Sequence, residues 1–239
     1  MDAASASTHR PDVVVIVSAF NEADRIAATV TALRDAFARD GEEVRIVVAD
    51  DHSTDTTAHV VLEAGAELVR APRNLGKGGA TTLAAREVLP LVLEPDPPVV
   101  VLCDGDLADT AVQLPRLVQA VRAGECDLAV AAFSRRVGGG FGVAVGYARA
   151  AIRRLCGLEL TAPISGQRAM RGEVLPAVVP FAPRFGMEIG MTVDATRAGF
   201  RVGEVELDLT HRATGRTLKG FLHRGRQLKD FVLVELSRR

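Results

Sequence analysis

Four short polar segments each follow an apolar run and carry groups that could bind a nucleotide. They are residues 20–22, 50–55, 74–78 and 104–106. Carboxylates, amides and hydroxyls can hydrogen-bond a ribose or the edge of a base. The Gly76-Lys77-Gly78 stretch opens a predicted helix, where backbone N–H groups and the Lys77 ammonium favour a phosphate.

Asp104 and Asp106 flank a single glycine. Mg²⁺ is typically held by one or two carboxylates together with substrate phosphates, so this pair could grip a divalent cation. Each segment alone is weak evidence, because Asp-Gly-Asp is also a common turn and the P-loop spacing is absent. Taken together and in this order, the segments predict a site for a nucleoside diphosphate and a metal.

Alternating strands and helices would position these segments. Apolar runs predict strands at 13–18, 44–49, 67–70, 99–102 and 127–132. Helical spacing predicts helices at 22–39, 54–64, 78–88 and 114–123, the second capped by Ser53 or Thr54. Such alternation predicts an α/β fold, with a Rossmann-like, mostly parallel sheet and helices on both faces. Ligands of such sheets bind at the carboxyl ends of the strands, where the four polar segments lie.

The pattern changes after Phe133. Residues 135–146 are rich in glycine and predict a loop that closes over a second substrate, followed by a helix near 147–155. We expect residues 1–11 to be disordered and 12–239 to form one domain. Within it, 12–132 would bind the nucleotide and 133–239 the acceptor.

Composition limits the functions to consider. The chain has 239 residues, 48% of them hydrophobic, and a net charge of −1, which argues against a dedicated nucleic-acid binder. No apolar run reaches the roughly 18 residues of a membrane span. The three cysteines, Cys103, Cys126 and Cys156, form no C-x-x-C pair and predict buried thiols in a reducing compartment. We therefore expect a soluble, cytoplasmic protein.

The charge is unevenly distributed. Residues 211–239 hold eight Lys/Arg and two Asp/Glu, whereas the remainder of the chain is acidic. Two interpretations stay open: a solvated terminal helix, or a surface that meets phosphates on a substrate or a membrane.

The sequence resembles the family 2-like glycosyltransferases of the GT-A fold. The matching stretches are 15–22, 48–57, 74–78 and the Asp104-Gly105-Asp106 segment, which is similar to the family's Asp-x-Asp metal motif. The second half resembles the glucosyl-3-phosphoglycerate synthase branch at 163–169, at 185–190 with Asp194, and at His211-Arg212. Residues 165–167 read Ser-Gly-Gln, where that branch tends to have Ala-Gly-Glu.

The resemblance implies a role for each matching residue. The residues implied for the nucleotide sugar are Ala19, Phe20, Asn21, Glu22, Asp51, Ser53, Gly76, Lys77, Asp104 and Gly105. Asp104, Asp106 and His211 would bind Mg²⁺ or Mn²⁺, and Glu188, Asp106 and Lys77 would be catalytic. The residues expected at the acceptor are Arg135, Arg136, Gly166, Gln167 and Arg168, with Arg184 as a further candidate.

The expected function is metal-dependent transfer of a sugar, with glucose favoured, from a UDP-sugar to a small anionic acceptor such as a phosphorylated glycerate. Glu188 could hold sugar hydroxyls in a retaining reaction, which the resemblance favours, or deprotonate the acceptor in an inverting one. The main alternative is inverting transfer from UDP or GDP to a polyprenyl or dolichyl phosphate at a membrane surface. A nucleotidylyltransferase and a catalytically silent nucleotide-binding module rank lower. The resembled family also suggests a homodimer.

Overall fold

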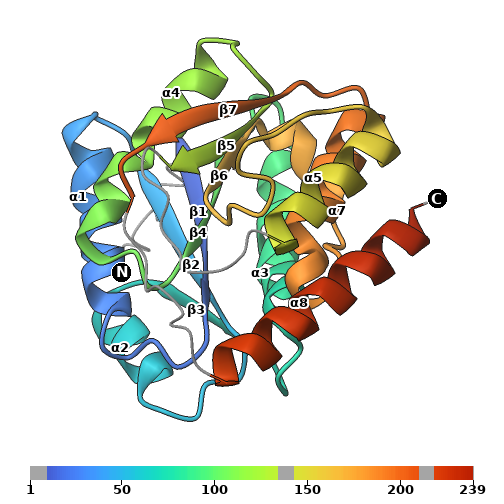
Figure 1. Ribbon diagram of the computed structural model, residues 1–239. Coiled ribbons are helices and arrows are strands. Elements are labelled where there is room, and N and C mark those ends of the chain that lie inside the picture. Colours follow the sequence, from blue (N-terminus) through green and yellow to red (C-terminus); the bar gives the residue numbers. More distant parts are fainter. Residues whose placement is uncertain (1–9, 134–142, 210–217, 239) are drawn as a thin grey trace, which may run out of the picture.

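The structure is a computed structural model that describes residues 10–133, 143–209 and 218–238 (Figure 1). Its strands are β1 (Val13–Ala19), β2 (Val44–Asp50), β3 (Glu67–Arg70), β4 (Val99–Asp104), β5 (Leu128–Phe133), β6 (Arg168–Met170) and β7 (Val202–Leu207). Its α-helices are α1 (Ile26–Arg39), α2 (Thr57–Glu63), α3 (Lys77–Val92), α4 (Pro115–Arg122), α5 (Val143–Cys156), α6 (Leu175–Val178), α7 (Met187–Arg197) and α8 (Leu218–Ser237). Short 3₁₀ turns are η1 (Ala108–Gln113), η2 (Gly172–Val174) and η3 (Arg184–Gly186).

Within these residues the strands form one sheet in the order β3-β2-β1-β4-β6-β5-β7. β1, β2, β3 and β4 pair in parallel, and so do β5 and β7. The short strand β6 lies antiparallel between β4 and β5. The fold is therefore the predicted α/β fold with a mostly parallel sheet, and β6 carries the second half of the chain back into its centre.

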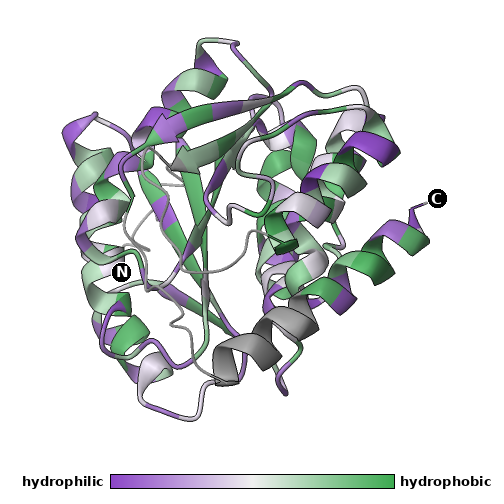
Figure 2. Cartoon of the chain, in the orientation of Figure 1, coloured by the Kyte–Doolittle hydropathy of each residue, from purple (hydrophilic) through white to green (hydrophobic). Residues whose placement is uncertain are grey.

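The central strands are buried on both faces. Val13, Val15 and Val17 pack toward α1, α2 and α4, whereas Val14 and Ile16 pack toward α3, α6 and α7. Figure 1 shows α1, α2 and α4 on one side of the sheet and α3, α5 and α7 on the other. Figure 2 shows hydrophobic residues concentrated along these central strands. A continuous β-branched run is typical of such a doubly covered strand.

Helix α8 packs on the outer layer formed by α5 and α7. Phe231 and Val234 join a third apolar cluster with Ile152 and Ile189. Val234 approaches Gly186 so closely that a Cβ on this glycine would overlap it. None of the described helices combines the length and the apolar character that a membrane crossing requires.

Several helix boundaries differ from the prediction. Helix α1 begins at Ile26 rather than at residue 22, because the preceding residues form a turn in which Asn21 has a φ of 56°. Helix α2 begins at Thr57, and neither Ser53 nor Thr54 caps it. Instead Asp55 Oδ1 accepts a hydrogen bond from the Thr57 amide at 2.9 Å.

Two expectations for the second half are also corrected. Helix α5 already begins at Val143, so Gly146 lies inside a helix and not in the glycine-rich loop. Residues 134–142 lie outside the described residues. Cys103 and Cys126 are buried free thiols as predicted, but Cys156 is only half-buried.

Candidate functional site

Parallel register brings three of the predicted segments together. Ala19 at the end of β1 lies opposite Asp50 of β2, and Ser18 lies opposite Asp104 of β4. The polar groups that follow these strands therefore share one edge of the sheet. In such sheets this edge is where ligands bind.

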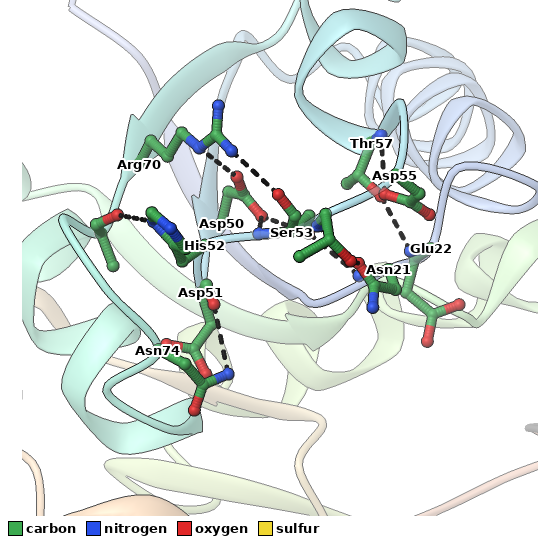
Figure 3. A network of polar contacts seen from close by, with 12 residues as sticks. Asn21, Glu22, Asp50, Asp51, His52, Ser53, Asp55, Thr57, Arg70 and Asn74 are labelled. Atoms are coloured by element: carbon green, nitrogen blue, oxygen red, sulfur yellow. Dashed lines mark hydrogen bonds and ion pairs between the residues drawn. The ribbon is translucent and has the colours of Figure 1, made fainter.

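The turns after β1 and β2 are fastened to each other (Figure 3). The Asn21 amide donates to Ser53 Oγ at 2.9 Å, and the Thr54 amide donates to Asn21 Oδ1 at 2.8 Å. The Glu22 amide donates to Thr57 Oγ1 at 2.9 Å. Phe20 stands beside this pair of turns with its side chain 46% exposed. The two turns thus form a fixed cradle with an exposed aromatic group at its rim.

The adjacent carboxylates of Asp50 and Asp51 have different partners and different roles in the structure. Asp50 is fully buried and accepts hydrogen bonds from the backbone amide and the hydroxyl of Ser53. Its other oxygen lies 3.3 Å from Arg70 Nε. Asp50 therefore holds the turn. The Ser53 hydroxyl is engaged by both Asp50 and Asn21, so this side chain shapes the cradle rather than facing a ligand.

Asp51 points to the other side of its strand, toward the loop before α3 (Figure 3). Its Oδ1 accepts from the Leu75 amide at 2.6 Å, and its Oδ2 accepts from the Gly76 amide at 2.9 Å. Burial raises the pKa of Asp51, against the opposing effect of these two amides. Gly76 has a φ of +77°, and a Cβ there would lie 2.6 Å from Arg184 Cγ. Only glycine fits this close approach.

Lys77, Asp104 and Glu188 form the charged centre of the site. Lys77 Nζ lies 2.6 Å from Asp104 Oδ1 and 2.8 Å from Glu188 Oε1. Burial acts to lower the pKa of Lys77, but the two carboxylates outweigh it and raise that pKa. Partial burial acts to raise the pKa of Asp104, and Lys77 with two further donors brings it below its usual value. Lys77 and Asp104 are therefore both charged at neutral pH.

The Ser165-Gly166-Gln167 turn closes on this centre. Gln167 Nε2 donates to Asp104 Oδ2 at 2.7 Å, and Ser18 Oγ donates to Asp104 Oδ1 at 3.1 Å. A Cβ on Gly166 would overlap Lys77 Nζ and lie 2.6 Å from Asp104 Oδ2. Gly166 and Gln167, which the sequence analysis expected at the acceptor, thus lie against Lys77 and Asp104.

The two acids of the Asp-x-Asp segment are not equivalent. Both oxygens of Asp104 are engaged by Lys77, Ser18 and Gln167. In the described part of the chain, no donor or cation pairs with the Asp106 side chain, whose backbone oxygen accepts from Arg25 Nη1 at 3.1 Å. One uncommitted carboxylate at a strand end fits a divalent cation that is otherwise held by phosphates.

A complete protein-only metal centre is not formed by the described residues, which contain no group of three or more His, Cys, Asp or Glu suited to a metal. His211, the third ligand implied by resemblance, lies outside the described residues. Gly105 lies against the end of β1: its amide donates to Ser18 O at 2.9 Å, and a Cβ there would lie 3.1 Å from Ile26 Cδ1.

The arginines expected at the acceptor have different positions. Arg168 is fully buried and does not reach a surface that an acceptor could touch, so its expected direct contact is not found. Arg184 is exposed and lies over Gly76, with a φ of 53°. Arg135 and Arg136 lie outside the described residues.

Sequence reasoning missed Ser18, Arg25 and Thr192, whose hydroxyl accepts a hydrogen bond from Arg168 Nη1 at 2.9 Å. Ser18 is a polar residue within an apolar, buried strand, which was an available signal, since a hydroxyl in such a strand needs a partner. Arg25 and Thr192 lie on helix-like segments without any distinguishing pattern. Their roles follow only from the packing of segments that are distant in the sequence.

Comparisons with known proteins identify sequences that are similar to this chain. The sequence model of the family described as glycosyl transferase family 2 matches residues 14–176. An undecaprenyl-phosphate mannosyltransferase of Micrococcus luteus is 32% identical over 222 residues, which cover 86% of this chain and 86% of that protein. A glucosyl-3-phosphoglycerate synthase of Mycolicibacterium paratuberculosis is 32% identical over 205 residues, covering 75% of this chain and 58% of that protein.

Solved structures of glucosyl-3-phosphoglycerate synthase from Mycobacterium tuberculosis share the fold. Its complex with Mn²⁺, UDP-glucose and glycerol 3-phosphate superposes with a TM-score of 0.74 at 25% identity, covering 95% of this chain and 80% of that one. Its complex with Mg²⁺ and UDP gives a TM-score of 0.73, also at 25% identity, covering 95% and 79%.

Proposed function

The chain belongs to glycosyl transferase family 2 and is a glycosyltransferase, and we propose that it transfers a hexose from a UDP-sugar to a small phosphate-bearing acceptor. Glucose is the first candidate for the sugar and a phosphorylated glycerate for the acceptor. The observation that carries the proposal is the meeting of Lys77, Asp104 and Glu188 beside the glycine turn at 76. The Lys77 ammonium lies at the N-terminus of α3, where a phosphate is favoured, so it could stabilise a leaving diphosphate. The carboxylates of Asp104 and Glu188 on either side of it could hold the hydroxyls of a sugar.

The cradle after β1 and β2 would hold the uridine. Ala19, Phe20, Asn21 and Glu22 form one wall, and the exposed ring of Phe20 could lie against the base. Asp51 would meet an N–H of the base, because its Oδ2 accepts one hydrogen bond among the described residues and a carboxylate oxygen can accept two. Ser53 and Asp50 would not contact the uridine. They would hold this wall in place through the hydrogen bonds of Ser53 to Asn21 and Asp50.

Asp106 would contribute the protein carboxylate to a Mg²⁺ or Mn²⁺ ion, with His211 as the further ligand implied by resemblance. When bound, such an ion neutralises the charge that develops on the leaving diphosphate. Lys77 would share this task, because it opens α3 next to Gly76 and its ammonium can turn from Asp104 toward a phosphate. The solved complexes of the M. tuberculosis enzyme with UDP and either Mn²⁺ or Mg²⁺ support the proposal of a nucleotide and a divalent cation.

Glu188 would hold hydroxyls of the transferred sugar. Its carboxylate pairs with Lys77 at 2.8 Å, so taking up a proton would cost this ion pair. That arrangement favours retention, in which the leaving phosphate takes the acceptor proton, over inversion with Glu188 as general base.

The acceptor would lie on the side of Gly166 and Gln167. Both reach the charged centre from residues 133–239, whereas Lys77 and Asp104 come from 12–132. We therefore propose that the first half of the domain binds the nucleotide of the donor, and that the second half binds the acceptor and, through Glu188, the sugar. Arg184 and the arginines at 135 and 136 would meet the acceptor phosphate.

A polyprenyl phosphate is the second candidate acceptor. The M. luteus relative that acts on undecaprenyl phosphate aligns over 86% of both chains. In addition, Val232, Leu233 and Leu236 of α8 present exposed apolar side chains. Both candidate acceptors carry a phosphate, so they would place the same demand on the charged centre and differ in the surface beyond it.

Calorimetric titration with UDP, UDP-glucose, GDP and GDP-mannose, with and without Mn²⁺ or Mg²⁺, tests the donor. We expect metal-dependent UDP binding that Asp106→Ala abolishes, with Asp109→Ala as the matched exposed control. A guanosine preference would move the assignment to the mannosyl-type donor. No nucleotide binding with metal present would overturn the proposal.

Turnover with 3-phosphoglycerate, glycerol 3-phosphate and a short polyprenyl phosphate in detergent then tests the acceptor. Release of UDP and the anomeric configuration of the product are read by NMR. Product from only the lipid phosphate would replace the small acceptor with the lipid one. An inverted product would overturn the assignment of Glu188.

A further inference from the structure

Arg168 is the largest side chain in the described core, and it is fully buried. Its Nε donates to Ser165 O at 2.9 Å and its Nη2 to Pro163 O at 3.1 Å. Its Nη1 donates to Thr192 Oγ1 at 2.9 Å. Every partner is a neutral oxygen, and no carboxylate among the described residues forms an ion pair with this guanidinium.

A buried cation without a paired anion is costly, and burial lowers the pKa of Arg168 to about 10. A core that needed only volume would accommodate an apolar side chain more favourably. The three hydrogen bonds leave from one rigid, planar fork, which can span acceptors on separate segments in a way that a lysine cannot. The geometry therefore indicates a residue that joins segments.

The two segments that Arg168 joins are the 163–167 turn and helix α7. Both approach Lys77 from the second half of the chain. The 163–165 carbonyls lie directly before Gly166 and Gln167, whose positions fit closely against Asp104 and Lys77. Thr192 Oγ1 accepts from Arg168 and donates to the Glu188 carbonyl at 2.9 Å, in the first turn of α7. Arg168 thus hydrogen-bonds both to the turn that carries Gln167 and to Thr192, which hydrogen-bonds the backbone of Glu188.

We propose that Arg168, acting through Thr192, is a positioning residue for the sugar transfer, because it ties the 163–167 turn to α7 and so sets Gln167 on Asp104 and Glu188 on Lys77. This inference rests on the proposed function. Arg168 touches no substrate in this arrangement. Its effect is on the placement of groups that hold the sugar and the acceptor, where shifts below 1 Å change rates strongly.

The sharpest test uses Thr192, which lies outside the charged centre. Thr192→Val keeps the shape of the side chain but removes the link, whereas Thr192→Ser retains the hydroxyl. We expect Thr192→Val to lower kcat roughly tenfold or more, and Thr192→Ser to stay within about twofold of wild type. UDP affinity with Mn²⁺ should remain within about twofold in both variants, since the cradle lies on other loops.

Arg168→Lys and Arg168→Met extend the test. Lysine keeps the charge but cannot reach three acceptors, so both variants should lose kcat even where the protein stays folded. If Thr192→Val and Arg168→Lys lower only the Tm and leave kcat of the folded protein unchanged, Arg168 is merely structural and the proposal fails.

Hydrogen exchange keeps the two proposals separable. In Thr192→Val, amides of residues 164–167 and the first turn of α7 should exchange faster than in wild type, while those of β1 and β2 should not. If wild-type protein turns over no acceptor, the proposed function fails and exchange alone decides the joining role. Unchanged exchange at 164–167 would refute it.

Discussion

Lys77 Nζ lies 2.8 Å from Glu188 Oε1, although Lys77 begins α3 in the first half of the chain and Glu188 lies in α7 in the second. The same ammonium lies 2.6 Å from Asp104 at the end of β4. One cation therefore links a sheet edge to helices from both halves. Removing its charge should disturb both carboxylates together.

Lys77→Met should reduce kcat by about 10²–10³, the usual cost of losing one preorganised group that stabilises developing charge. The variant should also have a lower Tm, because Asp104 and Glu188 would lose the cation that pairs with both of them. Lys77→Arg should recover part of the rate, because it restores the charge with a different shape. Steady-state kinetics on both variants, with exposed Lys229→Met as the control, would check this. An unchanged kcat in Lys77→Met would remove Lys77 from the mechanism.

Gly166→Ala should separate Lys77 from Asp104, since the added Cβ would overlap Lys77 Nζ. We expect at least about a tenfold loss in kcat/KM, because the displaced groups belong to one charged centre. Gly146→Ala is the matched control, because nothing lies within 4 Å of a Cβ there and the position is helical. That control should keep its activity and gain up to about 1 kcal/mol of stability. Equal activities for the two variants would contradict the close approach at Gly166.

Asp127 gives a prediction about acid stability. Side-chain hydrogen bonds from Arg201, assisted by the Arg201 amide at 2.8 Å, hold the pKa of Asp127 below its usual value. A folded-state pKa that lies below the unfolded one adds stability. This stability is present above the unfolded pKa of about 4 and is lost as pH falls through the folded pKa. Asp127→Asn should therefore cost about 1–2 kcal/mol at pH 7, discounted for the exposure of Arg201.

Urea unfolding of wild type and Asp127→Asn at pH 7 and near pH 3 measures this difference. The gap between the two proteins should shrink at the lower pH. Asp109→Asn, an exposed control, should stay within about 0.5 kcal/mol of wild type at both. A gap that is independent of pH would show that the charge of Asp127 contributes nothing.

The sheet and its polar edge were predictable from the sequence, because a β-branched run such as Val13–Ser18 is typical of a strand that is buried on both faces of a sheet. Parallel pairing then puts the segments after Ala19, Asp50 and Asp104 at one edge without further information. The same reasoning could not predict β6, which has only three residues, Arg168–Met170, and no periodicity. Yet the antiparallel insertion of β6 brings Gln167 to Asp104.

Arg168 shows where residue type misleads. An arginine near a predicted acceptor loop was expected to bind a phosphate or a carboxylate, because the geometry of a guanidinium suits these anions. Tertiary packing instead surrounds it with the Ser165 and Pro163 carbonyls and Thr192. Nothing local distinguishes these two fates, since the deciding acceptor lies on α7. Likewise, the sequence identifies Asp50 and Asp51 only as a pair of acids. The structure shows that Asp50 holds the turn at Ser53, whereas Asp51 faces the loop before α3.

The two acids of the Asp-x-Asp segment should behave differently when each is changed alone. Asp104 is held by Lys77, Gln167 and Ser18, so Asp104→Asn should misplace Lys77 and lower kcat while metal-dependent UDP binding survives. Asp106 has no partner among the described side chains, so Asp106→Asn should weaken metal binding first. Titration of Mn²⁺ in the presence of UDP would separate them: we expect a Kd for Mn²⁺ raised at least about tenfold in Asp106→Asn, as for loss of one carboxylate ligand, and changed little in Asp104→Asn. A loss of Mn²⁺ affinity of equal size in both variants would mean that Asp104 leaves Lys77 and joins Asp106 at the metal, and that the contacts of Asp104 belong to the ligand-free protein alone.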